Sequence, residues 1–296
     1  MRRILALAAA ATLLTAGCAD SRSGSLGPAP SLAPSGDPSA TTAADPPSGS
    51  AAPVGPPRTG VPPAGTTSAQ SGTITIQLWF TRAGRLAPTR RTRPATLATS
   101  RLALTELAAG PSAAERAAGL ATALPAEPGF TVEGISGRVA TVDAGPAFSA
   151  GSPAAVRLRR AQVVYTLTQF PTVARVRFRS GGDPAGRGAY ADLLPPIVVL
   201  DPVIGRRVSS PITITGTADV FEATVSVRLL DGAGAELATA FTTATCGSGC
   251  RGDYRLTLPY RTTGGGAGTV EVYQVSAKDG SRQDVVSVPV RLAASP

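Results

Sequence analysis

The stretch SPAAVRLRRAQVVYTLTQFPTVARVRFRS, residues 152–180, decides the class of the fold. Its first part predicts a helix, because Ser152 can cap a helix start and Pro153 suits the first helical turn. Apolar side chains then recur at helical spacing, at Val156, Val163, Val164, Leu167 and Phe170. We therefore expect a helix with one face buried.

The second part of this stretch has the period of a strand. Apolar residues alternate with arginines, in the order Ala174, Arg175, Val176, Arg177, Phe178, Arg179. Because successive side chains of a strand point to opposite faces, one face would be buried and the other would carry the three arginines.

Further elements precede this unit. TITIQLWF, residues 73–80, alternates and predicts a strand, and residues 81–94 read as a short hairpin-like extension that ends in a loop stopped by proline. A helix is expected from Thr96 to the stop at Gly110-Pro111, with Leu97 among its apolar positions. The motif SAAE, residues 112–115, is a capping box that begins a second short helix.

Residues 130–144 complete this region, with two strands expected around the turn at Ser136-Gly137. The order strand, helix, strand, strand, helix, strand predicts an α+β two-layer sandwich over residues 73–180, with the helices on one face of a small sheet. A linker is expected over residues 181–196.

Residues 197–293 have a different character. Seven short strand candidates are separated by turns that contain Gly, Pro and Asp. This spacing predicts an all-β sandwich of the immunoglobulin-like type.

The N-terminus has the layout of a secretory signal. A basic MRR is followed by a short apolar run and by small residues before Cys18, so residues 1–17 read as a signal peptide. The apolar run is shorter than the roughly 20 residues that a membrane-spanning helix needs. LLTAGC resembles the bacterial lipobox, although Thr15 stands where Leu is usual. We expect lipidation of Cys18, and an ordinary cleaved signal with a chance cysteine is the alternative.

The segment 18–72 is rich in Pro, Ser, Ala and Gly and poor in large apolar residues. Such a composition cannot bury enough surface to offset the entropy of ordering, so a disordered tether is expected. A flexible chain of this length spans roughly 40 Å.

The positive charge is concentrated in residues 73–180, which hold fourteen arginines against five acidic residues. The candidate residues for an anionic partner are Arg82, Arg85, Arg90, Arg91, Arg93, Arg175, Arg177 and Arg179. One interpretation is that arginine is a default solvated residue of a GC-rich genome. The other is a surface for an anionic wall polymer or for lipid headgroups. No aromatic residues interleave these clusters, and the exported location also argues against nucleic acid.

Residue types that carry catalysis are scarce. The chain contains no histidine, and Lys278 is its only lysine. Ser-His-Asp, Cys-His and imidazole metal sites are thereby excluded. Carboxylate pairs for glycan hydrolysis are conceivable, but Glu115 is explained by its capping box and Glu106 by its place on a helix. We expect no catalytic site, no metal and no cofactor.

CGSGC, residues 246–250, holds the other two cysteines. In an exported chain such a pair most often forms a disulfide, here between Cys246 and Cys250 in a loop between two strands. A redox-active pair or a metal site are the alternatives, and neither has the context or the further ligands that it needs.

Several of these segments resemble known families. Residues 109–125, 139–143 and 157–178 look like the GerMN domain of sporulation and spore germination lipoproteins. Residues 210–237, 252–260 and 277–290 are similar to the immunoglobulin-like domain of bacterial spore germination proteins. The resemblance implies an envelope lipoprotein linked to sporulation, wall assembly or signalling, and it brings no catalytic motif.

The sequence therefore predicts a lipoprotein on the outer face of the cytoplasmic membrane, held there by its lipid and without catalytic activity. The first hypothesis is a scaffold that binds an envelope protein or a second copy of itself. The second is direct binding of an anionic wall polymer or lipid headgroup through the arginines. A wall hydrolase is a third, and the sequence shows no facing carboxylates for it.

Overall fold

The computed structural model describes residues 72–294. All described residues belong to one compact unit. The predicted signal peptide 1–17, the lipidation site Cys18 and all but the last residue of the tether 18–72 lie outside the described residues.

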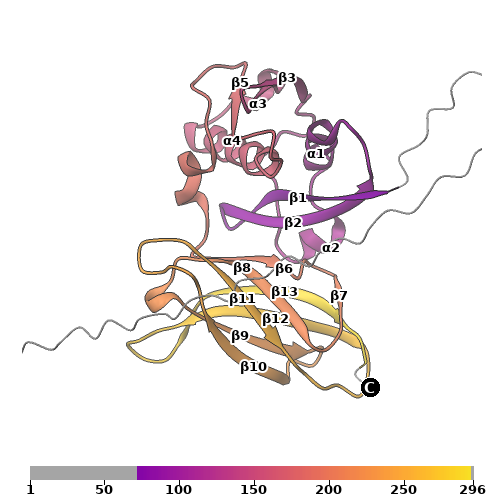
Figure 1. Cartoon of the computed structure of the whole chain (residues 1–296), viewed down its shortest axis with the longest axis vertical. Coiled ribbons are helices and arrows are strands. Elements are labelled where there is room, and N and C mark those ends of the chain that lie inside the picture. Colours follow the sequence, from indigo (N-terminus) through magenta and orange to yellow (C-terminus); the bar gives the residue numbers. More distant parts are fainter. Residues whose placement is uncertain (1–71, 295–296) are drawn as a thin grey trace, which may run out of the picture. The chain divides into compact units, whose positions relative to one another are not determined.

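The first domain mixes strands and helices (Figure 1). Its elements are β1 (Thr73–Arg82), β2 (Arg85–Pro94), α1 (Thr99–Ala108), α2 (Ala113–Ala117), β3 (Thr131–Ser136), β4 (Val139–Asp143), α3 (Gly145–Phe148), α4 (Pro153–Leu167) and β5 (Arg175–Phe178). This arrangement confirms the α+β class.

The strands of this domain form two separate sheets rather than the single small sheet expected. β1 and β2 make an antiparallel hairpin, and β3, β4 and β5 make a three-stranded sheet in that order. Helices α1 and α4 pack on β1, and they also contact strands of the other sheet. In Figure 1 both helices therefore lie between the hairpin and the three-stranded sheet.

Strand β2 accounts for the difference from the sequence prediction. It pairs with β1 over its whole length, from Arg85 opposite Arg82 to Pro94 opposite Thr73. Its prolines and arginines conceal this pairing, but a strand with a free edge tolerates proline because one side needs no N–H donor.

Helix α4 supplies much of the first core. The Ser152 hydroxyl accepts a hydrogen bond from the Ala155 N–H at 3.2 Å, as the capping prediction requires. All seven residues from Ala161 to Leu167 are buried, and the Tyr165 ring lies 4.8 Å from the Trp79 ring. Leu97 does not take part as expected, because α1 begins only at Thr99 and the Leu97 side chain is 91% exposed.

The second domain is the all-β sandwich that the turn spacing predicts. Its strands are β6 (Ile197–Asp201), β7 (Arg207–Val208), β8 (Ile212–Ala218), β9 (Thr224–Asp231), β10 (Glu236–Thr243), β11 (Gly252–Leu258), β12 (Gly266–Val275) and β13 (Arg282–Leu292). One sheet has the order β10-β9-β12-β13-β7 and the other β11-β8-β6. This confirms the immunoglobulin-like class, with the two-residue β7 as an addition.

In the smaller sheet of this sandwich, the backbone of β8 lies very close to groups of its two neighbouring strands. Tyr254 lies buried and donates its hydroxyl to the Val198 carbonyl at 3.1 Å. A Cβ at Gly216 would lie 2.0 Å from that carbonyl oxygen and 2.4 Å from the Tyr254 hydroxyl. Only glycine therefore fits at this position of β8.

The connection between the domains is itself folded. Ala185 forms a bridge with Val176 of β5, and a 3₁₀ turn, η1 (Arg187–Leu193), follows. Tyr190 of this turn is buried in the first core. None of the helices within residues 72–294 is long and apolar enough to cross a membrane.

Candidate functional site

The eight predicted arginines fall in two places. Five lie on or beside β2, namely Arg82, Arg85, Arg90, Arg91 and Arg93. The others, Arg175, Arg177 and Arg179, lie on or directly after β5. The two groups differ in what lies opposite their side chains.

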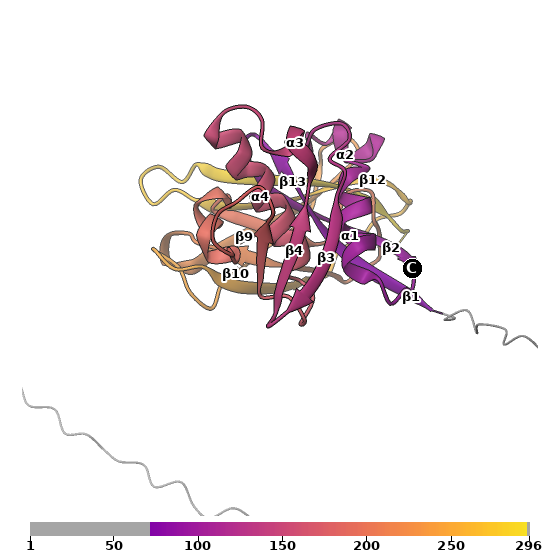
Figure 2. The ribbon, with the colours of Figure 1, turned by 90° about the horizontal axis from the view of Figure 1, so that it is seen from above.

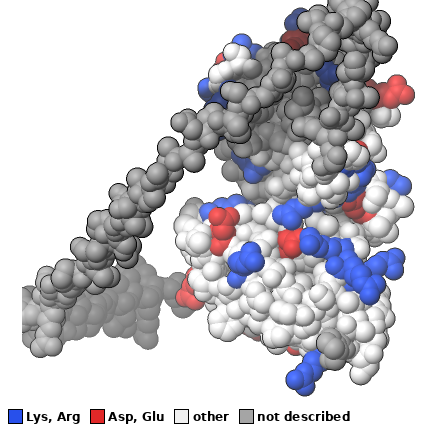
Figure 3. Space-filling model, turned by 45° about the vertical axis from the view of Figure 1, so that its right-hand side comes forward, with Lys and Arg blue, Asp and Glu red and all other residues white. Residues whose placement is uncertain are grey.

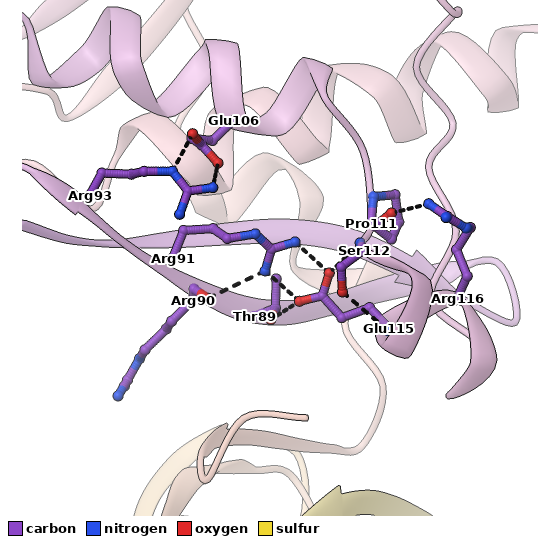
Figure 4. Close-up of polar contacts among 9 residues, drawn as sticks. All are labelled: Thr89, Arg90, Arg91, Arg93, Glu106, Pro111, Ser112, Glu115 and Arg116. Atoms are coloured by element: carbon purple, nitrogen blue, oxygen red, sulfur yellow. Dashed lines mark hydrogen bonds and ion pairs between the residues drawn. The ribbon is translucent and has the colours of Figure 1, made fainter. Parts of the chain in front are cut away.

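Arg91 forms a buried ion pair with Glu115 of α2 (Figure 4). Both of its terminal nitrogens donate to the Glu115 carboxylate, which also accepts from the Thr89 hydroxyl. The Ser112 N–H donates to the same carboxylate at 2.7 Å, which completes the predicted capping box. The sequence explains Glu115 by the cap alone, whereas the structure gives it a second role as the counter-ion of β2.

The hydrogen bonds to Glu115 change its acidity. Burial by itself raises the pKa of this carboxyl, but the donors Arg91, Thr89 and Ser112 outweigh burial and lower the pKa to about 2. Glu115 is therefore ionised at neutral pH, and the positive charge of Arg91 is balanced within the fold.

The remaining arginines of the hairpin are also engaged. Arg93 donates to both oxygens of Glu106 on α1, at 2.6 and 2.8 Å. Arg90 points away from these pairs in Figure 4, and it lies 3.5 Å from the Asp201 carboxylate of the second domain. The glutamates of two helices thus neutralise Arg91 and Arg93, whereas Arg90 shares the Asp201 carboxylate with Arg206, which lies 2.7 Å from it.

Arg82 and Arg85 contact carbonyl groups beyond the first domain. Arg82 donates to the Ser287 carbonyl at 3.2 Å, and Arg85 donates to the carbonyls of Asp192 and Leu194 at 3.0 and 3.1 Å. On the face shown in Figure 3, a few acidic side chains lie beside basic ones, a band of basic side chains runs across the lower half, and much of the remaining surface is uncharged. The five hairpin arginines do not form a free cationic patch.

The β5 arginines lie on a different kind of surface. Val176 and Phe178 are buried, so Arg175 and Arg177 point to the opposite face, where both are exposed as predicted. In Figure 2 the strands of this sheet lie in front of the helices, which leaves that face uncovered. We call it the open face, and it carries Glu133, Ser136, Val139, Thr141, Arg175, Arg177 and Arg179.

The charges of the open face are only partly balanced. Arg179 lies 3.1 Å from the Glu133 carboxylate. Arg175 and Arg177 have no ion pair or side-chain hydrogen bond with any residue that the structure describes. Their strand neighbours on β4 are Val139 and Thr141, which carry no charge. Two positive charges are therefore free on a face backed by a packed core.

Arg138 lies at the end of the sheet next to this surface, and the sequence gave no reason to select it. It is part of the turn between β3 and β4 with a positive φ of 61°, and its carbonyl accepts the N–H groups of Ala174 and Arg175. Its exposed side chain has no partner among residues 72–294. Only the register of β4 against β5 brings it beside Arg175, so no short motif could have identified it.

Other chemistry is not assembled in the described part of the chain. Residues 72–294 contain no group of three or more His, Cys, Asp or Glu side chains that could hold a metal ion. In the first domain Glu106, Glu115 and Glu133 are each paired with an arginine. Such pairs leave these carboxylates in a structural role rather than facing one another across a cleft.

The two cysteines of the second domain are joined. Cys246 and Cys250 form a disulfide with their Cα atoms 5.7 Å apart, in the connection between β10 and β11. A Cβ at the neighbouring Gly252 would lie 2.1 Å from the Cys246 nitrogen, so the bridge is packed closely against the start of β11. The disulfide clamps one loop of the sandwich.

Family comparisons match both domains. Residues 65–186 match the family described as "Sporulation and spore germination". Residues 196–281 match the family described as "Immunoglobulin-like domain of bacterial spore germination". No curated protein sequence matches the chain.

Three solved structures show more distant likeness. The tandem GerMN domains of the sporulation protein GerM from Bacillus subtilis are 16% identical, with 58% of this chain and 60% of that chain covered and a TM-score of 0.31. CopC from Methylosinus trichosporium OB3b is 16% identical over 33% of this chain and 94% of its own, with a TM-score of 0.22. WR4, a C. elegans MSP family member, is 14% identical over 33% of this chain and 97% of its own, with a TM-score of 0.20.

Proposed function

We propose that this protein is a non-catalytic interaction protein of the cell envelope. Its residues 65–186 belong to the sporulation and spore germination family. Its residues 196–281 form an immunoglobulin-like domain of bacterial spore germination. Both families are germination-related domains rather than enzymes. The proposed role is a scaffold in envelope assembly, sporulation-type processes or envelope signalling. The open face of the first domain is its contact surface, and the sandwich acts as a spacer.

One observation carries this proposal: Arg175 and Arg177 are exposed and unpaired within residues 72–294, while Arg91 and Arg93 of the hairpin are neutralised by glutamates. A rigid surface with two uncompensated charges fits an acidic surface on a protein partner, because complementary charge steers association and sets orientation. Strand β3 at the edge of the same sheet is largely exposed and pairs only with β4. A partner strand could add to that edge and bring its acidic side chains over the arginines.

Anchoring is the second part of the proposal. The signal-like residues 1–17 and the lipobox-like LLTAGC support lipidation at Cys18 and a place on the outer face of the cytoplasmic membrane. A Cys18→Ser variant should lose incorporation of a labelled fatty acid and leave the membrane fraction. Retention of both properties in the variant would contradict the anchor.

In-cell crosslinking tests the contact surface. A photo-crosslinking amino acid at the exposed Ser136 reports on the open face, and the same amino acid at the exposed Thr257 of β11 is the control. The expected result is one dominant protein, or a second copy of this chain, recovered from position 136 and absent from position 257. Equal recovery at both positions would refute the open face as the contact surface.

A second candidate function uses the same surface. Arg138, Arg175 and Arg177 carry no carboxylate partner among the described residues, which also suits an anionic wall polymer or lipid headgroups. Crosslinks from position 136 to glycan or lipid alone would favour this candidate over a protein scaffold. Their yield should fall steeply with added salt, because exposed charges are screened within about 10 Å at 0.1 M ionic strength.

A further inference from the structure

A second feature, away from the open face, is a cavity of about 290 Å³. It lies where β1, α4 and η1 of the first domain and its connection meet β6, β8 and the residue before β11. Its polar lining includes Gln77, Trp79, Tyr165, Arg187, Thr217 and Arg251. Cavities of this size accommodate small organic molecules.

Arg187 and Arg251 of this cavity form no ion pair with a carboxylate of the described residues. Arg187 donates to the Thr168 hydroxyl at 2.8 Å and to the Tyr165 carbonyl at 3.0 Å, and its remaining terminal nitrogen makes no hydrogen bond to any described residue. Arg251 donates to the carbonyls of Pro195 at 2.7 Å and Pro196 at 3.3 Å, and to the hydroxyl and the carbonyl of Thr217 at 3.3 and 3.4 Å. Asp219 interacts with Arg251 only by charge attraction at a distance, without a direct ion pair. Burial lowers the pKa of both guanidinium groups, because a desolvated charge without a counter-ion is unfavourable.

Two residues that line the cavity also hold buried donors without an acceptor. Trp79 is 3% exposed, and its indole N–H has no acceptor among the described residues. The amide nitrogen of Gln77 is likewise buried without a partner. Arg187 lies 5.9 Å from the ring centre of Trp79 and 5.2 Å from that of Tyr165. Buried donors that lack an acceptor are costly, and here they gather beside two positive charges.

We propose that this cavity binds a small organic anion, in which a carboxylate or a phosphate is joined to an apolar body. The anionic group would accept from Arg187 and Arg251, and the apolar body would lie against Leu194 and Leu200. The lining comes from both domains, so the bound anion would contact both. This inference does not depend on the contact surface proposed above, which shares no residue with the cavity.

The chain contains a direct probe of this cavity, because Trp79 is its only tryptophan. Phenyl phosphate, phenylacetate and the neutral benzyl alcohol are titrated against the detergent-solubilised full chain while Trp79 fluorescence is recorded. We expect the anions to change the emission saturably with a Kd of about 1 mM or below, as befits ligands of this size. Comparison of the two anions decides between phosphate and carboxylate, and inorganic phosphate should compete with the tighter one.

Variants test the role of the charges. Arg187→Gln and Arg251→Gln should each weaken anion binding by about tenfold or more, since each removes charge-assisted hydrogen bonds. Arg255→Gln is the matched control and should bind as the wild type does, because Arg255 lies at an exposed position of β11 and its side chain has no partner among residues 72–294. Arg187→Lys keeps the charge, and it replaces Arg187→Gln in this test if the glutamine variant loses its native circular dichroism spectrum.

Four results would overturn the proposal. The first is the absence of a saturable change with either anion. The second is equally tight binding of benzyl alcohol, which would make the cavity a merely apolar one. The third is unchanged anion affinity in folded Arg187 and Arg251 variants. The fourth is a lack of competition by inorganic phosphate in the wild-type chain.

Discussion

Strands β2 and β5 carry the same local pattern, arginines two residues apart on one face, and the fold uses them in opposite ways. Arg91 and Arg93 of β2 meet glutamates that project from α2 and α1. Arg175 and Arg177 of β5 meet no carboxylate among residues 72–294 and stay exposed. The charge of a segment therefore says little about its surface until the element that packs opposite each arginine is known.

The largest expected effect comes from breaking the buried pair at β2. Glu115→Gln removes the carboxylate that balances Arg91, so the folded state should lose about 3 kcal/mol at pH 7, the free energy equivalent of the pKa shift. Chemical denaturation of the variant and the wild type measures this difference. A loss below about 0.5 kcal/mol, the size expected of a plain surface substitution, would show that β2 and β5 arginines are energetically alike.

The same pair should make stability depend on pH in acid. The pKa of Glu115 is lowered in the folded state to about 2 from the ordinary 4.5, so its contribution is present above pH 4.5 and is lost as the pH falls toward 2. Unfolding free energies measured between pH 6 and pH 2 should fall more steeply for the wild type than for Glu115→Gln. Parallel curves for the two proteins would contradict the assignment.

The contrast between the strands also shows what the sequence can and cannot predict. The capping box was predicted from SAAE, because its partners lie three residues apart. The bond from Arg91 to Glu115 spans 24 residues and depends on the register of a hairpin whose second strand has no apolar alternation. The alternation around Arg175 was predictable since it is local, but the place of Arg138 next to Arg175 depends on the pairing of β4 with β5.

The same holds for whole strands and sheets: features set by local sequence patterns are predictable, and features set by contacts between distant residues are not. The sandwich strands were predicted from local turn and strand patterns, and they are present in the structure. The separation of the first domain into two sheets was not predicted, because it depends on how distant strands pair. The cavity at Trp79 collects residues from Gln77 to Arg251, a span that no local pattern covers.

An intermediate effect is expected for the second pair at β2. The Arg93 side chain is 40% exposed and that of Glu106 is 14% exposed, so solvent weakens their attraction. Arg93→Gln should cost about 1 kcal/mol, the upper range for an ion pair near the surface. A double-mutant cycle with Glu106→Gln measures the interaction free energy between Arg93 and Glu106. A value near zero would show that Arg93, like the β5 arginines, has no stabilising carboxylate partner.

A small effect on stability is expected from removing the free arginines. The double variant Arg175→Gln with Arg177→Gln should change the unfolding free energy by no more than about 0.5 kcal/mol, because both side chains are exposed and unpaired within the described chain. Crosslinking from position 136 should nevertheless fall by about tenfold. A stable variant with undiminished crosslinking would separate the partner from the arginines.

The smallest change in stability, and the sharpest test, would give β5 the carboxylate that β2 already has. Thr141 is the strand neighbour of Arg177 on the open face, so Thr141→Glu places a carboxylate beside that guanidinium. A cross-strand charge pair contributes roughly 0.2–1 kcal/mol, and the lower strand propensity of Glu offsets part of it, so stability should hardly move. Crosslinking from position 136 should fall in Thr141→Glu and persist in the matched Thr141→Gln. If both variants crosslink alike, the free charge of Arg177 is not what distinguishes the open face from the hairpin.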